Sequence, residues 1–266
     1  MRKTEAFYVD SSLSNIRNKP CLNEPPEQMI GHLEQVLSRW LSEHNLFECY
    51  CAYGCLASET LPIPSQDLRL IRNACSKRRS EFIGGRWCAH RALEEIGLAA
   101  CALPITALGS PLWPMGAIGS ITHDGGICLA LAALSQQTIG LGIDLFDVER
   151  TNQCGELVDL FLTSSEIQYV RRHWLADAYA RLFSAKESVV KAISSSVGRL
   201  IDLREIEITL TGSYFSAVIA GYENVIEGRC HRDNRFILSY ASLDAPLCAK
   251  SVGCVQGAAG RILNTD

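Results

Sequence analysis

The sequence predicts an α+β protein with helices and small antiparallel sheets in both halves of the chain. Apolar residues recur at helical spacing over residues 27–44 and 176–193, which predicts one helix in each half. Short apolar or alternating runs bounded by turn residues, such as 127–135 and 236–243, predict strands. The strands are expected to be joined by hairpins rather than through regular crossover helices, and this is typical of the α+β class.

Length and composition describe an ordinary globular protein. The chain has 266 residues, of which 47% are hydrophobic and 20% charged, and this fits one large domain or two small ones. A net charge of −4 argues against bulk binding to nucleic acid. The first residues lack the apolar core of a signal peptide, and the longest apolar run, 128–134, is too short to cross a bilayer. We therefore expect a cytoplasmic protein with no transmembrane segment.

The chain contains twelve cysteines, a high number for its length. Cys75, Cys88 and Cys128 lie within apolar segments, where a free thiol behaves as a small hydrophobic group. Without an export signal, we expect reduced thiols. Cys49, Cys51 and Cys55 have no second cluster at ligand spacing, so a zinc site is disfavoured.

The elements expected in the first half follow from periodicity, capping residues and breaks. Paired prolines predict the start of the first helix in this half, and a glycine predicts the end of its third helix. In order, we expect a polar arm at 1–24, a helix from Pro25 to about His44, a strand at 47–57, a helix capped by Ser65 that runs to Cys75, and a helix at 77–93 that ends near Gly97.

The second half begins after a turn-rich connector at residues 111–116. A capping box at Thr163 and Glu166 predicts the start of one helix, and Gly198 predicts the end of the next. In order, we expect a strand at 118–122, a turn at 123–126, a hairpin of strands 127–135 and 139–146 joined by Gln136 and Gln137, helices from Thr163 to about Trp174 and over 176–193, and strands at 205–210, 214–219 and 236–243.

The predicted helix over 176–193 carries polar residues beside its apolar stripe. Lys186, Glu187 and Lys191 lie off the stripe, and the last two are four apart, one turn above each other. Taken alone, this spacing fits an exposed salt bridge. Upstream, Asp144 interrupts an otherwise apolar strand, and a carboxylate in that setting needs a partner, a metal ion or a proton.

Two further features suggest sites for anions. The segment 77–93 has more basic than acidic residues, including Arg79 and Arg86. It is either a solvated face or a phosphate site, because arginine offers a planar and permanently charged fork. His123 lies at the end of an expected strand, beside a glycine turn, so it is either an ordinary core or loop histidine or a donor to an anion.

Three stretches together resemble the signature blocks of phosphopantetheinyl transferases. They are residues 119–123 (Gly-Ser-Ile-Thr-His), 142–145 (Gly-Ile-Asp-Leu) and 183–191 (Phe-Ser-Ala-Lys-Glu-Ser-Val-Val-Lys). Their order and spacing are similar to the Sfp type, which carries two lobes in one chain. The segments 79–93 and 111–114 resemble the enterobactin synthetase component D subgroup, so the resemblance covers roughly half of the chain.

This resemblance implies an enzyme that moves the 4′-phosphopantetheine arm of coenzyme A onto a carrier-protein serine, releases 3′,5′-ADP and requires Mg²⁺. It implies a fold of two similar α/β lobes related by a pseudo-two-fold, with the active site in the cleft between them. We place the lobes at residues 1–138 and 139–266. The expected partners are peptidyl, aryl or acyl carrier proteins, in siderophore or other nonribosomal peptide synthesis, and the expected state is a monomer.

The resemblance also implies roles for individual residues. Glu187 and Lys191 would be catalytic, since phosphoryl transfer depends on positioning and on neutralising charge. The remaining assignments are Asp144 and Glu187 to the metal ion, Lys186 and Lys191 to phosphates, and Arg79, Arg86, Thr122 and His123 to the nucleotide end of coenzyme A.

Two positions depart from the family pattern. Phe146 stands where a second acid is common, and Gly109 stands where an arginine is common. The first leaves two protein carboxylates for the metal ion, and Mg²⁺ tolerates this because it usually keeps several waters. The alternatives are a non-catalytic subunit that binds coenzyme A or a carrier protein, and a magnesium-dependent nucleotide hydrolase, for which no phosphate-cradling P-loop is present.

Overall fold

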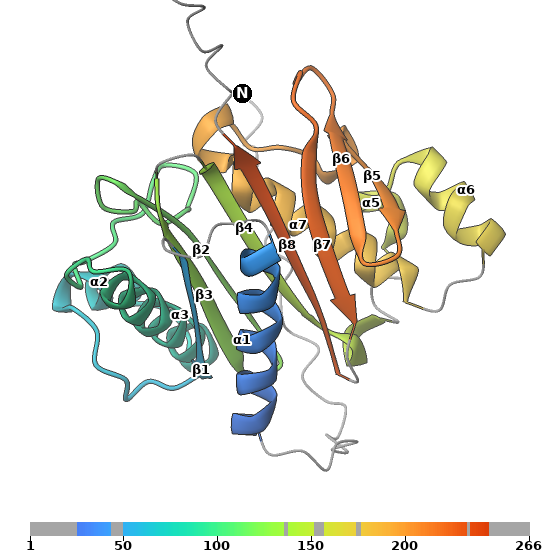
Figure 1. The fold of residues 1–266 in the computed structure, drawn as a ribbon. Coiled ribbons are helices and arrows are strands. Elements are labelled where there is room, and N and C mark those ends of the chain that lie inside the picture. The colour runs from blue at the N-terminus through green and yellow to red at the C-terminus, as the bar shows by residue number, and fades with distance from the viewer. Residues whose placement is uncertain are drawn as a thin grey trace, which may run out of the picture.

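The computed structural model describes residues 26–43, 50–135, 138–151, 157–173, 177–232 and 235–244. Within these ranges the strands form two antiparallel sheets, one in the order β1-β3-β2 and one in the order β4-β8-β7-β6-β5 (Figure 1). The strands are β1 (Tyr50–Leu56), β2 (Ala117–Asp124), β3 (Ile127–Leu134), β4 (Thr138–Asp147), β5 (Ile206–Thr211), β6 (Tyr214–Ile219), β7 (Ile226–Arg232) and β8 (Phe236–Asp244).

Each sheet has one long helix on one face, and both of these helices have 20 residues. The helices are α1 (Pro26–Glu43), α2 (Ser65–Leu70), α3 (Ser76–Glu95), α5 (Val158–Phe161), α6 (Ser164–His173) and α7 (Ala178–Val197), with short 3-10 turns at Val148–Arg150 and Leu203–Glu205. Helix α3 packs on the first sheet and α7 on the second, whereas α1 lies across both (Figure 1). The predicted α+β class, with two lobes, is confirmed.

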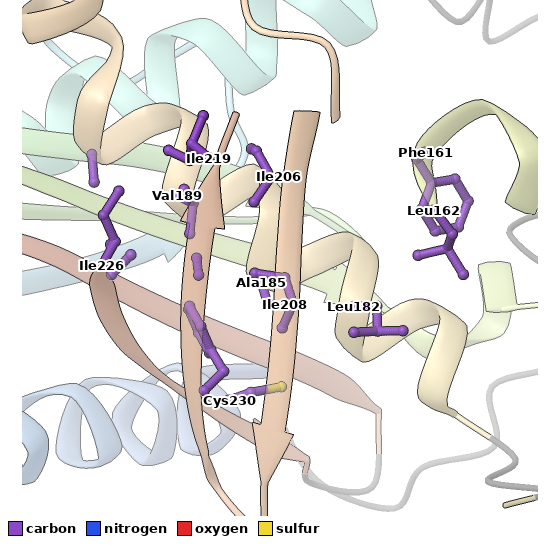
Figure 2. Packing of buried hydrophobic residues seen from close by; sticks show 14 of the residues in the cluster. Phe161, Leu162, Leu182, Ala185, Val189, Ile206, Ile208, Ile219, Ile226 and Cys230 are labelled. Atoms are coloured by element: carbon purple, nitrogen blue, oxygen red, sulfur yellow. The ribbon is translucent and has the colours of Figure 1, made fainter. Parts of the chain in front are cut away.

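The apolar stripe predicted for α7 forms the core of the second lobe. Leu182, Ala185, Val189, Ala192 and Ile193 are all buried in the core between α7 and the second sheet. Figure 2 shows the first three of them together with residues of β5 to β7. Burying this stripe fixes the rotation of the helix about its own axis. The polar residues beside the stripe are thereby held in one direction, and Gly198 ends the helix in a left-handed conformation, as predicted.

Two glycines allow α7 to approach β4 closely. Residues 140, 142, 144 and 146 of β4 alternate onto the face that α7 covers. A Cβ atom at Gly140 would overlap the backbone oxygen of Ala192, and one at Gly142 would overlap that of Ser188. The helix backbone therefore lies against the strand at these two positions, and Asp144, the next residue on this face, points toward α7.

The two sheets meet along a seam between β2 and β4. Alternate side chains of β2 accept hydrogen bonds from alternate amides of β4: Ile143 N to Ser120 Oγ at 3.0 Å, Leu145 N to Thr122 Oγ1 at 3.0 Å, and Asp147 N to Asp124 Oδ2 at 2.9 Å. Strand β4 pairs with β8 on its other edge, so these amides would otherwise be buried without partners. We call these three hydrogen bonds the seam.

Several predictions about local structure were wrong. Strands 127–135 and 139–146 do not form a hairpin, because both edges of β3 are already paired, with β1 and β2. Instead β2 and β3 form the hairpin, and its turn is Gly125 and Gly126, both with positive φ. The predicted turn at 123–126 therefore begins too early, since His123 and Asp124 still belong to β2.

Other differences concern lengths and one missed strand. Helix α2 ends at Leu70 rather than Cys75, and the Ser65 side chain makes no capping hydrogen bond. Strand β7 was not predicted, because its sequence mixes glycine and charged residues with few apolar ones. The predicted polar arm at 1–24 and the turn at Gln136 and Gln137 lie outside the described residues. Among the helices that are described, none is long and apolar enough to cross a membrane.

Candidate functional site

The candidate site lies where α7 crosses β4, beside the seam. Lys191 Nζ is 2.7 Å from Asp144 Oδ1 and donates to the Ile143 carbonyl at 3.0 Å and to Thr122 Oγ1 at 3.3 Å. Thr122 in turn donates to Asp144 Oδ1 at 3.4 Å and accepts from the Leu145 amide. The structure thus brings together three of the predicted site residues: Thr122, Asp144 and Lys191.

The Thr122 hydroxyl is fully used within the protein. A hydroxyl has one proton and two lone pairs, and here the proton faces Asp144 while the lone pairs face Lys191 and the Leu145 amide. The residue is buried, with 3% of its surface exposed. Its contacts orient Asp144 and Lys191 and tie both to the seam, which differs from the predicted contact with coenzyme A.

Glu187 is half-buried on α7, one turn before Lys191. Burial raises the pKa of the Glu187 carboxyl, the neighbouring Asp144 carboxylate raises it further, and the Lys191 ammonium partly opposes both. A carboxyl group whose pKa is raised by a second carboxylate beside it marks a suitable place for a cation. Asp144 and Glu187 are therefore the candidate metal pair. In the described part of the chain, no group of three or more His, Cys, Asp or Glu side chains has metal-binding geometry.

Phe146 shares the α7-facing side of β4 with Asp144 but belongs to the core. It is 2% exposed, and its ring lies 5.8 Å from the ring of Phe183, which in turn lies 5.2 Å from the ring of Phe161. The place of a second carboxylate is therefore taken by an aromatic cluster that packs α7 and α5 against β4.

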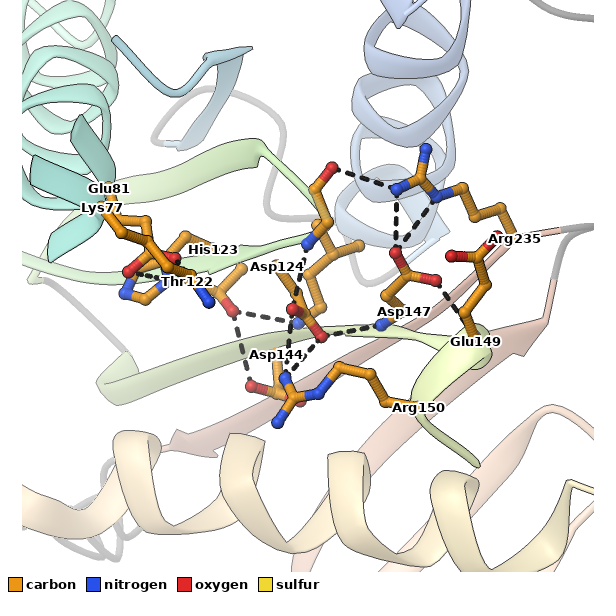
Figure 3. Close-up of polar contacts among 12 residues, drawn as sticks. Lys77, Glu81, Thr122, His123, Asp124, Asp144, Asp147, Glu149, Arg150 and Arg235 are labelled. Atoms are coloured by element: carbon orange, nitrogen blue, oxygen red, sulfur yellow. Dashed lines mark hydrogen bonds and ion pairs between the residues drawn. The ribbon is translucent and has the colours of Figure 1, made fainter. Parts of the chain in front are cut away.

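A second group of charged residues surrounds His123 at the other side of the seam (Figure 3). Arg78 Nη1 donates to His123 Nε2 at 3.2 Å, and Glu81 Oε2 lies 3.7 Å from His123 Nδ1. Burial, and then the charges of Arg78, Lys191 and Lys77, lower the pKa of His123 to about 4. His123 is therefore neutral at pH 7, in a region where positive charge prevails.

The two predicted arginines have different surroundings. Arg79 lies away from His123, because its Nε pairs with Glu59 Oε2 at 2.8 Å. Arg86 is buried, with its guanidinium 4.8 Å from the centre of the Phe82 ring, and its Nε and Nη1 have no hydrogen-bond partner. Burial lowers the pKa of Arg86 to about 10. Its unpartnered donors remain available to an anion, whereas the Nε and Nη1 donors of Arg79 are bound to Glu59 and to the Ile71 carbonyl.

Lys186 does not point toward the other predicted site residues. The side chain is completely buried, and its ammonium pairs with Glu166 Oε2 at 2.6 Å and donates to the carbonyls of Phe161 at 2.8 Å and Leu203 at 3.0 Å. An ammonium has three protons, so every donor has an acceptor inside the protein. These contacts give Lys186 a structural role in the described fold, and its contact with a phosphate stays a prediction.

Two ion pairs frame the end of the seam and were missed by sequence reasoning. Arg150 Nη1 contacts both carboxylate oxygens of Asp124, at 3.1 and 3.0 Å, and Arg235 donates to Asp147 Oδ2 at 3.1 and 2.9 Å (Figure 3). Arg78 was also missed, although its spacing of three from Glu81 places both on one side of α3. That spacing was the available signal.

A surface pocket of about 460 Å³ lies elsewhere, on β5 to β8. Its lining includes Thr209, Tyr214, Glu227 and Tyr240, and it includes none of the predicted site residues. The chemistry described above therefore does not depend on this pocket.

Comparison with known proteins places the chain in a family. The family model for the 4′-phosphopantetheinyl transferase N-terminal domain matches residues 66–133, and the model for the 4′-phosphopantetheinyl transferase superfamily matches residues 140–241. The chain is 32% identical over 177 residues to 4′-phosphopantetheinyl transferase Npt of Nocardia iowensis, covering 62% of this chain and 76% of that protein. The chain belongs to the 4′-phosphopantetheinyl transferase family, and the suspected family is confirmed.

Two further relatives match over shorter regions. The chain is 37% identical over 132 residues to Enterobactin synthase component D of Salmonella typhi, covering 48% of this chain and 53% of that protein. It is 36% identical over 149 residues to 4′-phosphopantetheinyl transferase Svp of Streptomyces mobaraensis, covering 53% of this chain and 58% of that protein. The matched regions thus span little more than half the length of these two relatives.

Proposed function

We propose that this protein transfers the 4′-phosphopantetheine arm of coenzyme A to a serine hydroxyl of a carrier protein and releases 3′,5′-ADP. The observation that carries the proposal is the convergence of Asp144, Glu187 and Lys191 where α7 crosses β4. Two acids and one ammonium at a partly open position can hold a diphosphate together with a cation. Membership of the transferase family supports the reaction class.

The nucleotide end of coenzyme A is assigned to the first lobe. His123 and Arg78 lie together, and Arg86 has buried donors without partners. The charge of Arg78 contributes to the lowered pKa of Arg86, so the two guanidinium groups act on the same region. A phosphate placed there would satisfy free N–H donors and would favour a charged His123. Arg79 is not included, because Glu59 holds it elsewhere.

Asp144 and Glu187 are the residues that would hold Mg²⁺. The fit rests on their donor chemistry, since Mg²⁺ prefers oxygen ligands and commonly takes one or two carboxylates plus substrate phosphates. The raised pKa of Glu187 beside Asp144 supports the pairing, because a bound cation would offset their mutual repulsion. When bound, the ion would neutralise charge on the diphosphate of coenzyme A.

The chain's own residues account for the proton and for the leaving group. The Glu187 carboxylate accepts the proton of the carrier serine, whose oxygen forms the new bond to phosphorus. The bond from that phosphorus to the bridging oxygen breaks, and 3′,5′-ADP leaves with the oxygen. Lys191 exchanges its longest contact, 3.3 Å to Thr122, for a diphosphate oxygen and offsets the growing charge there.

The direct test incubates an apo carrier protein with coenzyme A, Mg²⁺ and the protein, and measures carrier mass and 3′,5′-ADP release. The expected result is a mass gain equal to the arm on the carrier serine, with nucleotide release that requires the carrier. Glu187→Gln should lose the reaction, whereas Glu227→Gln, at an exposed position of β7, should keep it. Binding of coenzyme A without transfer would favour a non-catalytic binding subunit, and nucleotide release without carrier would favour a hydrolase.

The narrower assignments remain proposals. Identity to Enterobactin synthase component D supports carrier proteins of siderophore or other nonribosomal peptide synthesis as partners. We also propose a cytoplasmic monomer divided near residues 138 and 139, at the first residue of β4. Helix α1 packs against both sheets, so its core contacts belong to both proposed lobes.

A further inference from the structure

Three cysteines gather in the first lobe, away from Asp144 and Glu187. Cys55 of β1 and Cys128 of β3 are direct partners across the strand pair, and Cys88 of α3 lies over them. The Cys88 and Cys55 sulfurs are 3.3 Å apart. The Cys88 thiol also contacts the Cys128 carbonyl at 3.5 Å. We call these three residues the thiol cluster.

The members of the thiol cluster differ in access to solvent. Cys88 and Cys128 are 0% exposed. Cys55 is half-buried, and its strand β1 is at the edge of the three-stranded sheet. A small reagent in solution would therefore reach Cys55 first.

The buried thiols also activate Cys55. Hydrogen bonds from Cys128 and then from Cys88 stabilise its thiolate and lower the pKa of the Cys55 thiol well below its usual range, against the opposing effect of burial. The thiolate is the nucleophilic form of cysteine. Access and activation thus coincide at one residue of the cluster.

We propose that the thiol cluster is an oxidation site in which Cys55 reacts with a hydroperoxide and Cys88 closes a disulfide bond with it. The Cys55 sulfur attacks the peroxide O–O bond, becomes a sulfenic acid and releases the other oxygen as water or an alcohol. The Cys88 sulfur then attacks the Cys55 sulfur, the S–O bond breaks and water leaves. Two thiols are oxidised by two electrons in total, and one peroxide is reduced.

The geometry suits Cys88 as the second partner. A disulfide bond is about 2.0 Å long, so the sulfurs at 3.3 Å must approach by about 1.3 Å. The new bond would fasten edge strand β1 to α3. The cluster also touches the α3 backbone, where Cys128 contacts the Glu81 carbonyl at 3.5 Å and Cys55 the Gly84 carbonyl at 3.6 Å. Since Cys128 pairs with His123 across β2 and β3, their side chains lie on the same face of the sheet, and the cluster lies beside the His123 group.

The test treats the full-length protein with hydrogen peroxide, blocks the remaining thiols and maps tryptic peptides by mass. Cleavage after Lys and Arg leaves Cys88 alone in peptide 87–91, Cys75 alone in 73–77, and Cys55 in 40–69 together with Cys49 and Cys51. The expected product is a disulfide between peptides 40–69 and 87–91. It should persist in Cys75→Ser and disappear in both Cys55→Ser and Cys88→Ser.

A second measurement keeps the inference testable if a variant folds poorly. In Cys88→Ser the sulfenic acid has lost its partner, so dimedone should label Cys55 in peptide 40–69. The inference is overturned if peptide 87–91 stays reduced while exposed Cys75 is oxidised, or if the disulfide still forms in Cys55→Ser. Neither readout uses transferase activity, so this result stands or falls separately from the proposed function.

Discussion

Replacing Lys186 with methionine tests the structural role that the fold gives this residue. The change keeps the length of the side chain but removes an ammonium whose three protons are bound at 2.6, 2.8 and 3.0 Å. Glu166 would remain buried, still accepting from the amides of Thr163 and Ile208 but without its cation. Removing one partner of a buried ion pair costs about 3–5 kcal/mol, because an uncompensated charge stays behind.

Lys191→Met is the matched control, since both lysines are on α7, five residues apart. At about 2–4 °C per kcal/mol for a protein of this size, Lys186→Met should lower the melting temperature by roughly 6–20 °C. At temperatures where it stays folded, its KM for coenzyme A should remain within about threefold of wild type, that is ~0.7 kcal/mol. Lys191→Met should show the reverse balance, with a smaller loss of stability, because this ion pair is partly exposed to solvent, and a large loss of turnover.

Thermal unfolding measures the change in melting temperature, and steady-state carrier modification measures turnover and the KM for coenzyme A. A loss of stability below about 1 kcal/mol in Lys186→Met would show that the buried pair contributes little beyond an exposed one. A tenfold rise in the KM for coenzyme A while the protein is folded would show that Lys186 contacts the phosphates and would refute a purely structural role.

Further predictions concern the metal pair, the close helix contact and the His123 group. Glu187→Gln should slow carrier modification at least a hundredfold, about 3 kcal/mol, while its melting temperature stays that of the wild type. Turnover near the wild-type rate would remove Glu187 from the mechanism. Gly142→Ala should destabilise the protein by about 1–3 kcal/mol in urea unfolding and also reduce activity, since its methyl group pushes α7 from β4. Arg78→Ala should weaken coenzyme A binding by ~1.5–3 kcal/mol in calorimetry and weaken binding of 3′-dephospho-coenzyme A less. Arg79→Ala, the control, should change the affinity for both ligands equally. If both variants lose equal affinity for the two ligands, the assignment of Arg78 is contradicted. Because the pKa of His123 is about 4 when folded and ~6.5 when unfolded, the unfolded chain binds more protons between these values, so stability falls as pH drops through that window. His123→Gln should reduce that fall in urea unfolding at pH 7 and 4.5, and an unchanged pH dependence would argue against a neutral buried His123.

Sequence patterns predicted what depends on local periodicity. The α7 stripe, the Gly198 cap and the capping box at Thr163 and Glu166 all arise from contacts within a few residues, and all three appear in the structure. The sequence pattern also singled out Asp144, because a lone acid in an apolar strand is costly without a partner.

What was missed depends on contacts distant in sequence. The partner of β4 is β8, about a hundred residues later, and no local pattern distinguishes this pairing from a hairpin with β3. Likewise Lys186 and Glu187 are adjacent, but Lys186 is held in the core by Glu166 and two backbone carbonyls, whereas Glu187 lies near Asp144. The choice between the neighbours Arg78 and Arg79 also depends on a distant contact. Glu59, twenty residues before Arg79, binds the Arg79 guanidinium, so Arg78 is the arginine that reaches His123.

The seam gives the two sheets a fixed alignment. Its acceptors are side chains on every second residue of β2, so the next alignment that offers any of these acceptors is two residues away, about 7 Å along the strand, and even there one amide would face Ile118 or Gly126, which have no side-chain acceptor. That step would place the Asp124 carboxylate or the Ser120 hydroxyl where Thr122 now meets Asp144 and Lys191. Intermediate positions leave buried amides unpaired, so gradual sliding is costly. The seam therefore fixes the separation between the His123 group and the carboxylate pair. Under the proposed function, this separation sets the distance that a bound coenzyme A has to span.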